Sequence, residues 1–249
     1  MKAATRRLVL TLAIALVALA LWDSFIVYPF RVFVVFLHEI SHGIAAVLTG
    51  GRIVAIGLTF DEGGVCVTDG GSRFWILNAG YLGSLARGVF FLLVGARPGR
   101  ARPLVACVGA FTLVVTLLYV RTPFGILYGL ATGAALLAVA RRLSTGVSEV
   151  LLAAIGVVSC LYAVWDVASD VLLRDVSGSD ASALALVTRI PAFLWGSAWV
   201  AISIAVLILT LRRLAGRALL VALLLVAPGI ALYNRWGRAV GPPDFGAST

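Results

Sequence analysis

The chain carries very little charge. Only 12% of its 249 residues are Asp, Glu, Lys or Arg, and 61% are hydrophobic. An ordinary soluble domain has about 25% charged residues and about 45–50% apolar ones. Here uncharged apolar stretches recur at the length of about 20 residues that is needed to cross a bilayer. These properties exclude a water-soluble fold and predict an integral membrane protein.

Cysteine and histidine are also scarce. The three cysteines, Cys66, Cys107 and Cys160, are far apart, and no C-x-x-C spacing occurs. This pattern excludes a disulfide framework and a metal site built from cysteine pairs. We expect all three to be free, buried thiols. The chain has only two histidines, and both belong to one short motif.

The basic residues do not form a nucleic-acid-binding surface. The net charge of +9 comes mostly from short arginine clusters between apolar stretches. Basic residues at such positions anchor a membrane protein to anionic headgroups. No basic face is interleaved with aromatic residues, so we expect the lipid bilayer, and no nucleic acid, as a partner.

Apolar runs separated by charge clusters and by Pro or Gly predict the membrane-spanning helices. Eight candidate spans fall at about residues 8–24, 29–49, 74–95, 103–120, 123–140, 149–173, 191–211 and 217–233. Spans must be helical, because an open sheet cannot satisfy its backbone in lipid. We therefore predict an all-α polytopic membrane protein with about seven or eight transmembrane helices. It forms a single domain over residues 1–249, with a core at about 25–210 and a short polar tail at 234–249.

The segment between the second and third spans has a different pattern. Residues 52–68 place an Asp61-Glu62-Gly63-Gly64 turn between two short apolar runs. This pattern predicts a short β-hairpin at the membrane surface. The hairpin is either a structural loop or a sheet edge that receives an extended segment of substrate.

The second span contains an HExxH motif, formed by His38, Glu39 and His42. A spacing of four puts both imidazoles on one face of a helix, where they bind one Zn²⁺ while the glutamate lies beside it. Zinc polarises a carbonyl and acidifies water, and Glu39 takes the proton as general base. The alternative is a polar helix-packing patch without metal. Ionisable residues in a span are costly and usually functional, which favours the metal site.

A catalytic zinc site needs a third protein ligand. Only the sixth span offers carboxylates within its apolar run, Asp166 and Asp170. Asp166 lies seven residues before Leu173, as His42 does before Thr49, so both are expected about 10 Å from the same surface. We therefore favour Asp166 as the ligand. Asp170 is expected to support the site from nearby or to line a solvent channel, and binding by both remains open.

The third span contains two further polar residues of interest. Asn78 is a candidate for hydrogen bonding to substrate or to the oxyanion, although the surrounding small residues also suit close packing of the third helix on the second. Arg87 lies deeper in the same span. We expect its side chain to reach the membrane surface or to pair with a carboxylate.

Several motifs resemble one protein family. The first is FLHEISHGIAAVLTGG at residues 36–51, followed by the apolar hairpin and by NAGYLGS at residues 78–84. The Tyr-x-x-Trp-Asp-x-x-x-Asp of the sixth span and Ser179-Asp180-Ala181 extend the pattern. Together they resemble the M50B-like branch of the site-2 protease zinc metallopeptidases over about residues 30 to 210.

This resemblance implies a metalloprotease fold in which His38 and His42 bind zinc and Glu39 is the catalytic base. Better-known site-2 proteases take their third ligand from a Leu-Asp-Gly motif, which this chain lacks. The resemblance also implies a bacterial plasma-membrane protein that releases membrane-tethered regulators.

We therefore predict a zinc-dependent intramembrane metalloprotease that acts on membrane-embedded protein substrates. The first alternative is a non-catalytic scaffold or partner-binding homologue that keeps a structural or vestigial metal site. The second is a transporter that uses the same histidines and carboxylates as a relay. Transport requires polar residues along several helices, and most of these spans are almost wholly apolar.

Overall fold

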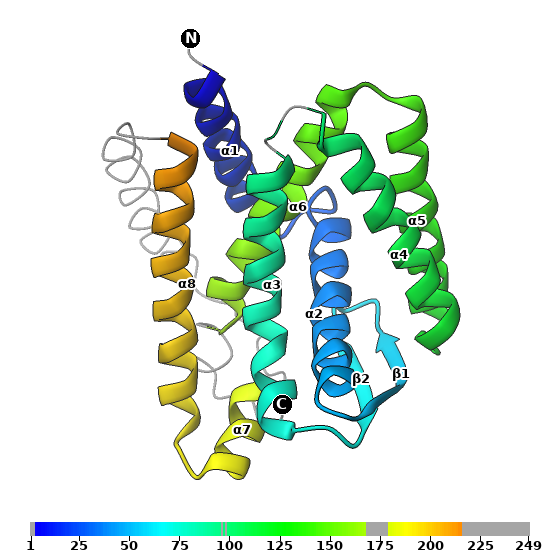
Figure 1. The fold of residues 1–249 in the computed structure, drawn as a ribbon, viewed down its shortest axis with the longest axis vertical. Coiled ribbons are helices and arrows are strands. Elements are labelled where there is room, and N and C mark those ends of the chain that lie inside the picture. The colour runs from blue at the N-terminus through cyan, green and yellow to red at the C-terminus, as the bar shows by residue number, and fades with distance from the viewer. Residues whose placement is uncertain (1–2, 96, 98, 168–178, 216–249) are drawn as a thin grey trace, which may run out of the picture.

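The protein is a bundle of helices with one small sheet (Figure 1). The computed structural model describes residues 3–95, 97, 99–167 and 179–215. The helices are α1 (Ala3–Ala20), α2 (Tyr28–Leu48), α3 (Arg73–Gly95), α4 (Ala101–Tyr119), α5 (Pro123–Arg142), α6 (Thr145–Val167), α7 (Asp180–Thr188) and α8 (Ala192–Ala215). The strands are β1 (Arg52–Leu58) and β2 (Gly64–Asp69).

Over the described residues, six helices are long and apolar enough to cross a membrane, namely α2, α3, α4, α5, α6 and α8. α1 adds a shorter apolar stretch, Leu8–Ala20. These helices correspond to the first seven predicted spans, and the prediction of a polytopic helical membrane protein is confirmed. The predicted span at 217–233, the tail at 234–249 and the end of the sixth span lie outside the described residues.

α2 begins and ends close to the positions that its sequence predicts. Pro29 lies in the first turn, where the missing N–H costs nothing. After Leu48 the chain turns through Gly50, whose φ of 88° suits glycine. The Gly51 amide then donates to the Ala46 carbonyl at 2.8 Å, which satisfies one of the free carbonyls at the helix end.

The predicted hairpin is confirmed. β1 and β2 pair antiparallel, with Arg52 opposite Asp69 and Leu58 opposite Gly64. The turn between them closes with a 2.9 Å bond from the Thr59 amide to the Gly63 carbonyl. The outer edge of β1 forms a parallel bridge from Ile56 to Val120, just before α5. β2 has no strand partner other than β1 within the described part of the chain.

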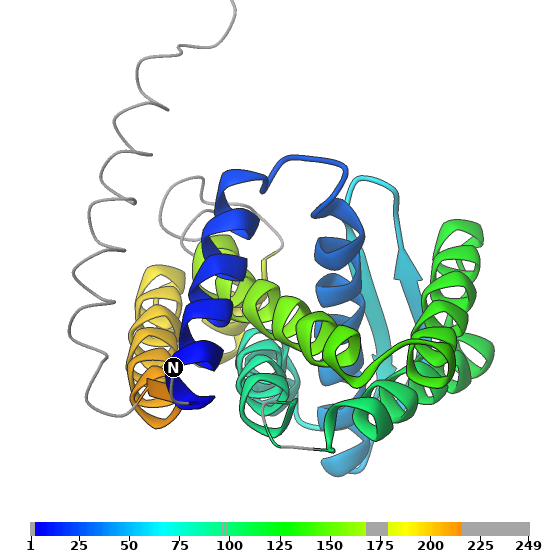
Figure 2. The same ribbon diagram turned by 90° about the horizontal axis from the view of Figure 1, so that it is seen from above.

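α2 is the central helix. It contacts α3, α6 and both strands, while α4 and α5 form a pair on one side of the molecule and α8 lies on the other (Figure 2). Its residues from Val32 to Gly43 are all buried. The largest core cluster joins five apolar residues of this stretch to residues of β1, α3, α4, α5 and α6. The HExxH motif therefore lies inside protein rather than against lipid.

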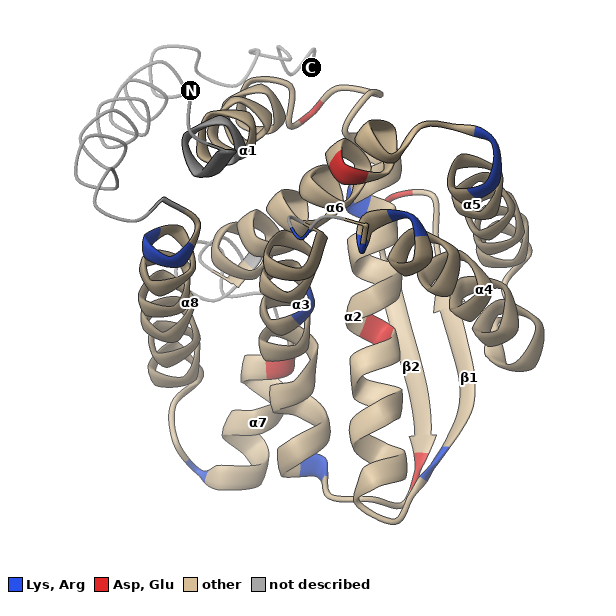
Figure 3. Cartoon of the chain, turned by 45° about the horizontal axis from the view of Figure 1, so that its top comes forward, with Lys and Arg blue, Asp and Glu red and all other residues tan. Residues whose placement is uncertain are grey.

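Two features differ from expectation. The short helix α7 was not predicted; it forms because Ser179 caps it, accepting a 3.2 Å bond from the Ser182 amide. The cysteines are free, as predicted, but the predicted burial holds only for Cys160. Cys66 is partly buried, and Cys107 is exposed on α4. Most described charged residues lie near helix ends and in connections (Figure 3).

Candidate metal centre

The two histidines and the glutamate of the motif share one buried region of α2. The exposed fractions of His38, Glu39 and His42 are 7%, 7% and 6%. The helix is continuous through them, so the imidazoles lie one turn apart with ring centroids separated by 4.7 Å. The predicted juxtaposition of the two histidines on one helix face is present.

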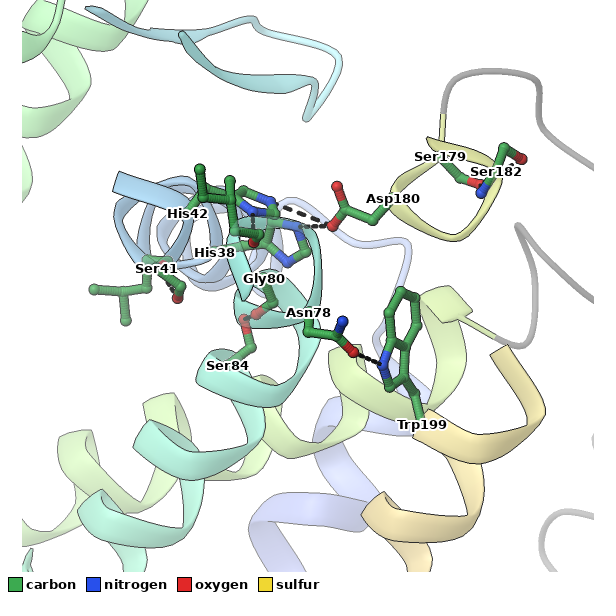
Figure 4. Close-up of polar contacts among 12 residues, drawn as sticks. His38, Ser41, His42, Asn78, Gly80, Ser84, Ser179, Asp180, Ser182 and Trp199 are labelled. Carbon is green, nitrogen blue, oxygen red and sulfur yellow. Dashed lines mark hydrogen bonds and ion pairs between the residues drawn. The ribbon is translucent and has the colours of Figure 1, made fainter. Parts of the chain in front are cut away.

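A third side chain, Asp180 of α7, meets both imidazoles. Its Oδ2 atom lies 3.1 Å from His38 Nε2 and 3.2 Å from His42 Nε2. Each of the three residues offers one ligand atom, and these atoms lie within 4.8 Å of one another. Figure 4 shows both imidazoles directed toward the carboxylate. Three donors from two helices therefore converge on one point.

α7 is held against the bundle by its apolar residues. Ala181 and Leu184 are fully buried and cluster with Tyr81 of α3 and Trp199 of α8. Asp180 is the first residue of this helix, directly after the Ser179 cap. The packing of the following turn thus fixes where the carboxylate lies relative to α2.

The hydrogen bond of His42 suits metal binding. Its Nδ1 lies 2.7 Å from the Ile76 carbonyl of α3, and a carbonyl can only accept, so Nδ1 carries the proton. The lone pair is then on Nε2, the atom that faces Asp180. Metal-binding histidines commonly donate their other N–H in this way. His38 Nδ1 is buried and has no hydrogen-bond partner among the described residues.

The donors present fit zinc. Two imidazole nitrogens and one carboxylate oxygen are a usual catalytic zinc set. Burial alone would raise the pKa of Asp180, but hydrogen bonds from the imidazoles, when both rings are protonated, hold that pKa below its ordinary value. A bound metal would take the place of the two Nε2 protons. Cys66 also lines the site, but burial and then the Glu39 charge raise the pKa of its thiol to about 12. A protonated thiol is a poor ligand.

The centre opens into a cavity of about 660 Å³. Glu39 lines this cavity together with the two histidines and Asp180. The remaining walls come from β2, the connection from β2 to α3, the first half of α3, single residues of α2 and α6, and the cap residue of α7. They are Val35, Gly64, Val65, Cys66, Thr68, Gly70, Gly71, Arg73, Ile76, Leu77, Tyr81, Tyr162 and Ser179. A carboxylate, a candidate metal centre and one strand of the hairpin therefore share one accessible space.

Two glycines allow this close arrangement. A Cβ at Gly80 of α3 would lie 2.5 Å from His38 Cε1 and 2.7 Å from His42 Cε1. A Cβ at Gly64 of β2 would lie 2.5 Å from Glu39 Oε1. Real Cβ atoms do not approach so closely, so α3 contacts the imidazoles, and β2 contacts the glutamate, only because these positions lack side chains.

Asn78 does not line the cavity. Its Nδ2 donates to the Phe74 carbonyl at 2.8 Å, and its Oδ1 accepts from Trp199 Nε1 at 2.9 Å (Figure 4). The amide thus links α3 to α8. Contact between Asn78 and substrate stays a prediction.

The two carboxylates predicted as ligands are not tested. Asp170 and the side chain of Asp166 lie outside the described residues. The prediction concentrated on carboxylates inside apolar spans, whereas Asp180 belongs to a short helix that is not among the membrane-spanning candidates. The Ser-Asp pair at 179–180 was an available signal. Ser is a usual helix cap and Asp is common in the first turn, so the pair predicts a helix that begins with a carboxylate in a fixed position.

Comparison with known proteins gives one match. The model of the family described as Peptidase M50B-like matches residues 11–210. No curated protein and no solved structure matches the chain.

Proposed function

The chain belongs to the peptidase M50B-like family, and on that premise we propose that it is a zinc-dependent intramembrane metalloprotease of a bacterial plasma membrane. The proposed reaction is hydrolysis of a peptide bond in or beside a membrane-spanning substrate. One observation carries the proposal. His38, His42 and Asp180 place three ligand atoms within 4.8 Å of one another, beside a cavity that Glu39 also lines.

Each residue has a distinct role in this proposal. His38, His42 and Asp180 would hold the zinc ion. When bound, zinc supplies a Lewis acid that polarises the scissile carbonyl and acidifies water. Glu39 takes a proton from the attacking water and then delivers it to the leaving nitrogen. Glu39 lines the same cavity as the three ligands, which suits its carboxylate to both transfers.

The substrate is proposed to bind in extended form. A helix cannot present its carbonyls, so segments that unwind at Gly or Pro are the expected targets. Gly64, Val65, Cys66 and Thr68 of β2 line the cavity, and the outer edge of β2 is unpaired within the described chain. An extended segment could add to that edge through main-chain hydrogen bonds and bring its carbonyl to the centre.

The alternative is a non-catalytic homologue with a structural metal. Catalytic zinc sites have three protein ligands and keep the fourth position for water or substrate, whereas structural sites are closed by four. Three donors cluster among the described residues, which favours catalysis. Asp166 and Asp170 remain predicted ligands. Binding by either, in addition to Asp180, would close the site.

Metal content tests the centre first. Purified wild type is expected to hold about one zinc per chain, because one site with three protein ligands binds one ion. Zinc should be lost in His38→Ala and Asp180→Asn and retained in Asp166→Asn, Asp170→Asn and Glu39→Gln. Loss in Asp166→Asn with retention in Asp180→Asn would move the third ligand to α6. Zinc-free wild type would leave the scaffold as the better account.

Cleavage tests the reaction. The protein is co-reconstituted in liposomes with a single-span reporter whose helix is interrupted by Gly-Pro, and an uninterrupted poly-Leu reporter serves as control. We expect cleavage of the first reporter only, and none by Glu39→Gln, which keeps its zinc. Equal cleavage by Glu39→Gln would remove Glu39 from the catalytic role.

A photo-crosslinker tests the strand edge. Placed at Val65, which lines the cavity, it should capture the interrupted reporter in the Glu39→Gln background. Val54 of β1 is exposed but does not line the cavity, so the same crosslinker there is the control. Capture at Val54 but not at Val65 would rule out binding along β2.

A further inference from the structure

An arginine in the middle of α3 contacts the α2 segment that carries the metal-binding motif. Arg87 Nη2 donates to the Leu37 carbonyl and, at 2.6 Å, to the Ser41 hydroxyl. Ser41 in turn donates to the Leu37 carbonyl at 2.9 Å. Neither of the two roles expected from the sequence is observed. The guanidinium turns to α2 instead of a membrane surface, and among the described residues it makes no ion pair.

The two acceptors have a defined relation to the metal centre. Leu37 directly precedes His38, and Ser41 directly precedes His42. Neighbouring residues on a helix are separated by about 100° around the axis, since one turn takes about 3.6 residues. Arg87 therefore holds one face of α2, while the imidazoles project from an adjacent face toward Asp180. It does not touch the ligands and acts through the helix.

Arg87 belongs to a stripe of α3 that faces α2. Gly80, Gly83, Ser84 and Arg87 follow the spacing i, i+3, i+4, i+7, which places them on one helix face. Gly80 meets the imidazoles, and a Cβ at Gly83 would lie 2.5 Å from Ser41 Oγ. The helices are thus in contact along the whole motif. A small rotation of α2 would change the direction of both histidines.

The Leu37 carbonyl does not need this arginine for its own hydrogen bonding. It lies inside α2, where carbonyls accept from the amide four residues later, and it already accepts from Ser41 Oγ. A charged side chain within a span is costly and is usually kept for function. Because simple hydrogen-bond satisfaction does not account for Arg87, its cost points to a role in the neighbouring centre.

We propose that Arg87 is a positioning residue for the metal centre: through Leu37 and Ser41 it sets the rotation of α2, so that His38 and His42 converge with Asp180. This role rests on the proposed function, because it presupposes a metal at that centre. It adds to that function a residue that contacts neither metal nor substrate and yet determines how well the metal binds.

The test measures metal affinity of the full-length protein in detergent, with Zn²⁺ and Co²⁺ alone as probes. Arg87→Met removes the donors and keeps most of the apolar stem. We expect it to weaken Zn²⁺ binding by about 10- to 100-fold, the usual effect of losing a group that orients a ligand. The absorption bands of bound Co²⁺ should also change, since they report ligand geometry. Arg87→Lys, which keeps a donor and its charge, should recover part of the affinity.

Two controls separate positioning from general damage. Arg102 of α4 also donates to carbonyls of a neighbouring helix, Ala140 and Arg141 of α5, far from the motif in sequence. Arg102→Met should lower thermal stability and leave Zn²⁺ affinity unchanged. Ser84 lies in the same α3 stripe, but its hydroxyl, among the described residues, bonds only within its own helix, to the Gly80 carbonyl, so Ser84→Ala should also keep affinity.

A second variant keeps the test decisive if Arg87→Met does not fold. Ser41→Ala removes one acceptor, and we expect Zn²⁺ affinity to fall by several-fold. In the double variant Arg87→Met/Ser41→Ala, the two losses of Zn²⁺ affinity should be less than additive, as for residues that act through each other. Wild-type affinity in Arg87→Met, or in Ser41→Ala if Arg87→Met does not fold, would overturn the positioning role. Wild type that binds no metal would overturn the proposed function itself.

Discussion

The helix pairs α2–α3 and α4–α5 are built alike and used differently. Both pack closely on glycine. In α4–α5, Gly109 and Gly133 face each other's helix backbone, and a Cβ at Gly133 would meet the Leu113 side chain. In α2–α3, the glycines face imidazoles and a serine hydroxyl. What occupies the space beside the glycine, aliphatic carbon or a metal-binding ring, separates a purely structural interface from a functional one.

The two pairs also differ in where their polar groups bond. Thr112 and Thr116 of α4 are buried and return their hydroxyls to carbonyls of their own helix. Arg102 bonds the last carbonyls of α5, which have no partner within that helix. Arg87 instead bonds the middle of α2. The polar bonds between α4 and α5 are therefore made at the end of a helix, whereas those from α3 reach the middle of α2, beside the candidate metal centre.

The largest expected difference comes from a methyl group at equivalent glycines. Gly80→Ala places Cβ against both imidazoles, and we expect Zn²⁺ affinity to fall by at least about 100-fold, because the ligands themselves must move. Gly133→Ala meets the Leu113 side chain and the Gly109 carbonyl, and it should lower stability by about 1–3 kcal/mol without changing the metal. Chelator competition and thermal unfolding measure the two effects. Equal Zn²⁺ affinity in both variants would contradict the assignment of Gly80 to the metal centre.

A second pair of glycines tests the hairpin. Gly64→Ala pushes on Glu39, and cleavage should fall by about 100-fold while zinc stays bound, since small displacements of a catalytic group cost that much. Gly57 of β1 does not face Glu39: a Cβ there would lie 3.0 Å from Val65 Cγ1 and 3.2 Å from Thr122 Cγ2. Gly57→Ala should therefore lower cleavage much less than Gly64→Ala does. Zinc loss in Gly64→Ala would assign the glycine to the metal centre instead.

The hydrogen bond between Asn78 of α3 and Trp199 of α8 is expected to contribute mainly to stability, as the buried threonines of α4 do. Both Asn78→Ala and Trp199→Phe remove the 2.9 Å hydrogen bond between the two side chains, and Asn78→Ala also removes the 2.8 Å bond to the Phe74 carbonyl. We expect each to lower stability by about 1–2 kcal/mol, and the pair to be less than additive. Substrate titration of both variants decides the predicted role of Asn78. A rise in KM in Asn78→Ala alone would establish contact with substrate.

The smallest effect is expected at a third arginine link, near the hairpin turn. Arg31 of α2 lies 2.7 Å from Glu62. Such partly exposed pairs contribute about 0–1 kcal/mol, so Arg31→Met should leave zinc binding intact and change stability little. Burial raises the pKa of Glu62, although Arg31 lowers it. Stability from Glu62 is thus fully present below its ordinary pKa and is lost as pH rises through the raised value. Glu62→Gln should remove that pH dependence in thermal unfolding.

Local sequence predicted most of the fold. Apolar runs of membrane length defined the helices, because each span satisfies its own backbone within one continuous segment. Pro29 and Gly50 marked the ends of α2, and the Gly-containing turn marked the hairpin. The helix α7 was not predicted because it is short and has little amphipathic pattern. Its local signal in the sequence is the Ser179 cap.

By itself, the sequence determined that this is a membrane protein with two histidines and a glutamate on one helix face, because these features follow from composition and from the periodicity of a single helix. Only the tertiary structure brought Asp180 to the histidines, 142 positions along the chain from His38. It likewise placed Gly80 and Arg87 against α2. Such contacts depend on how separate helices pack, and packing is decided by the shapes of whole interfaces, which no local spacing records.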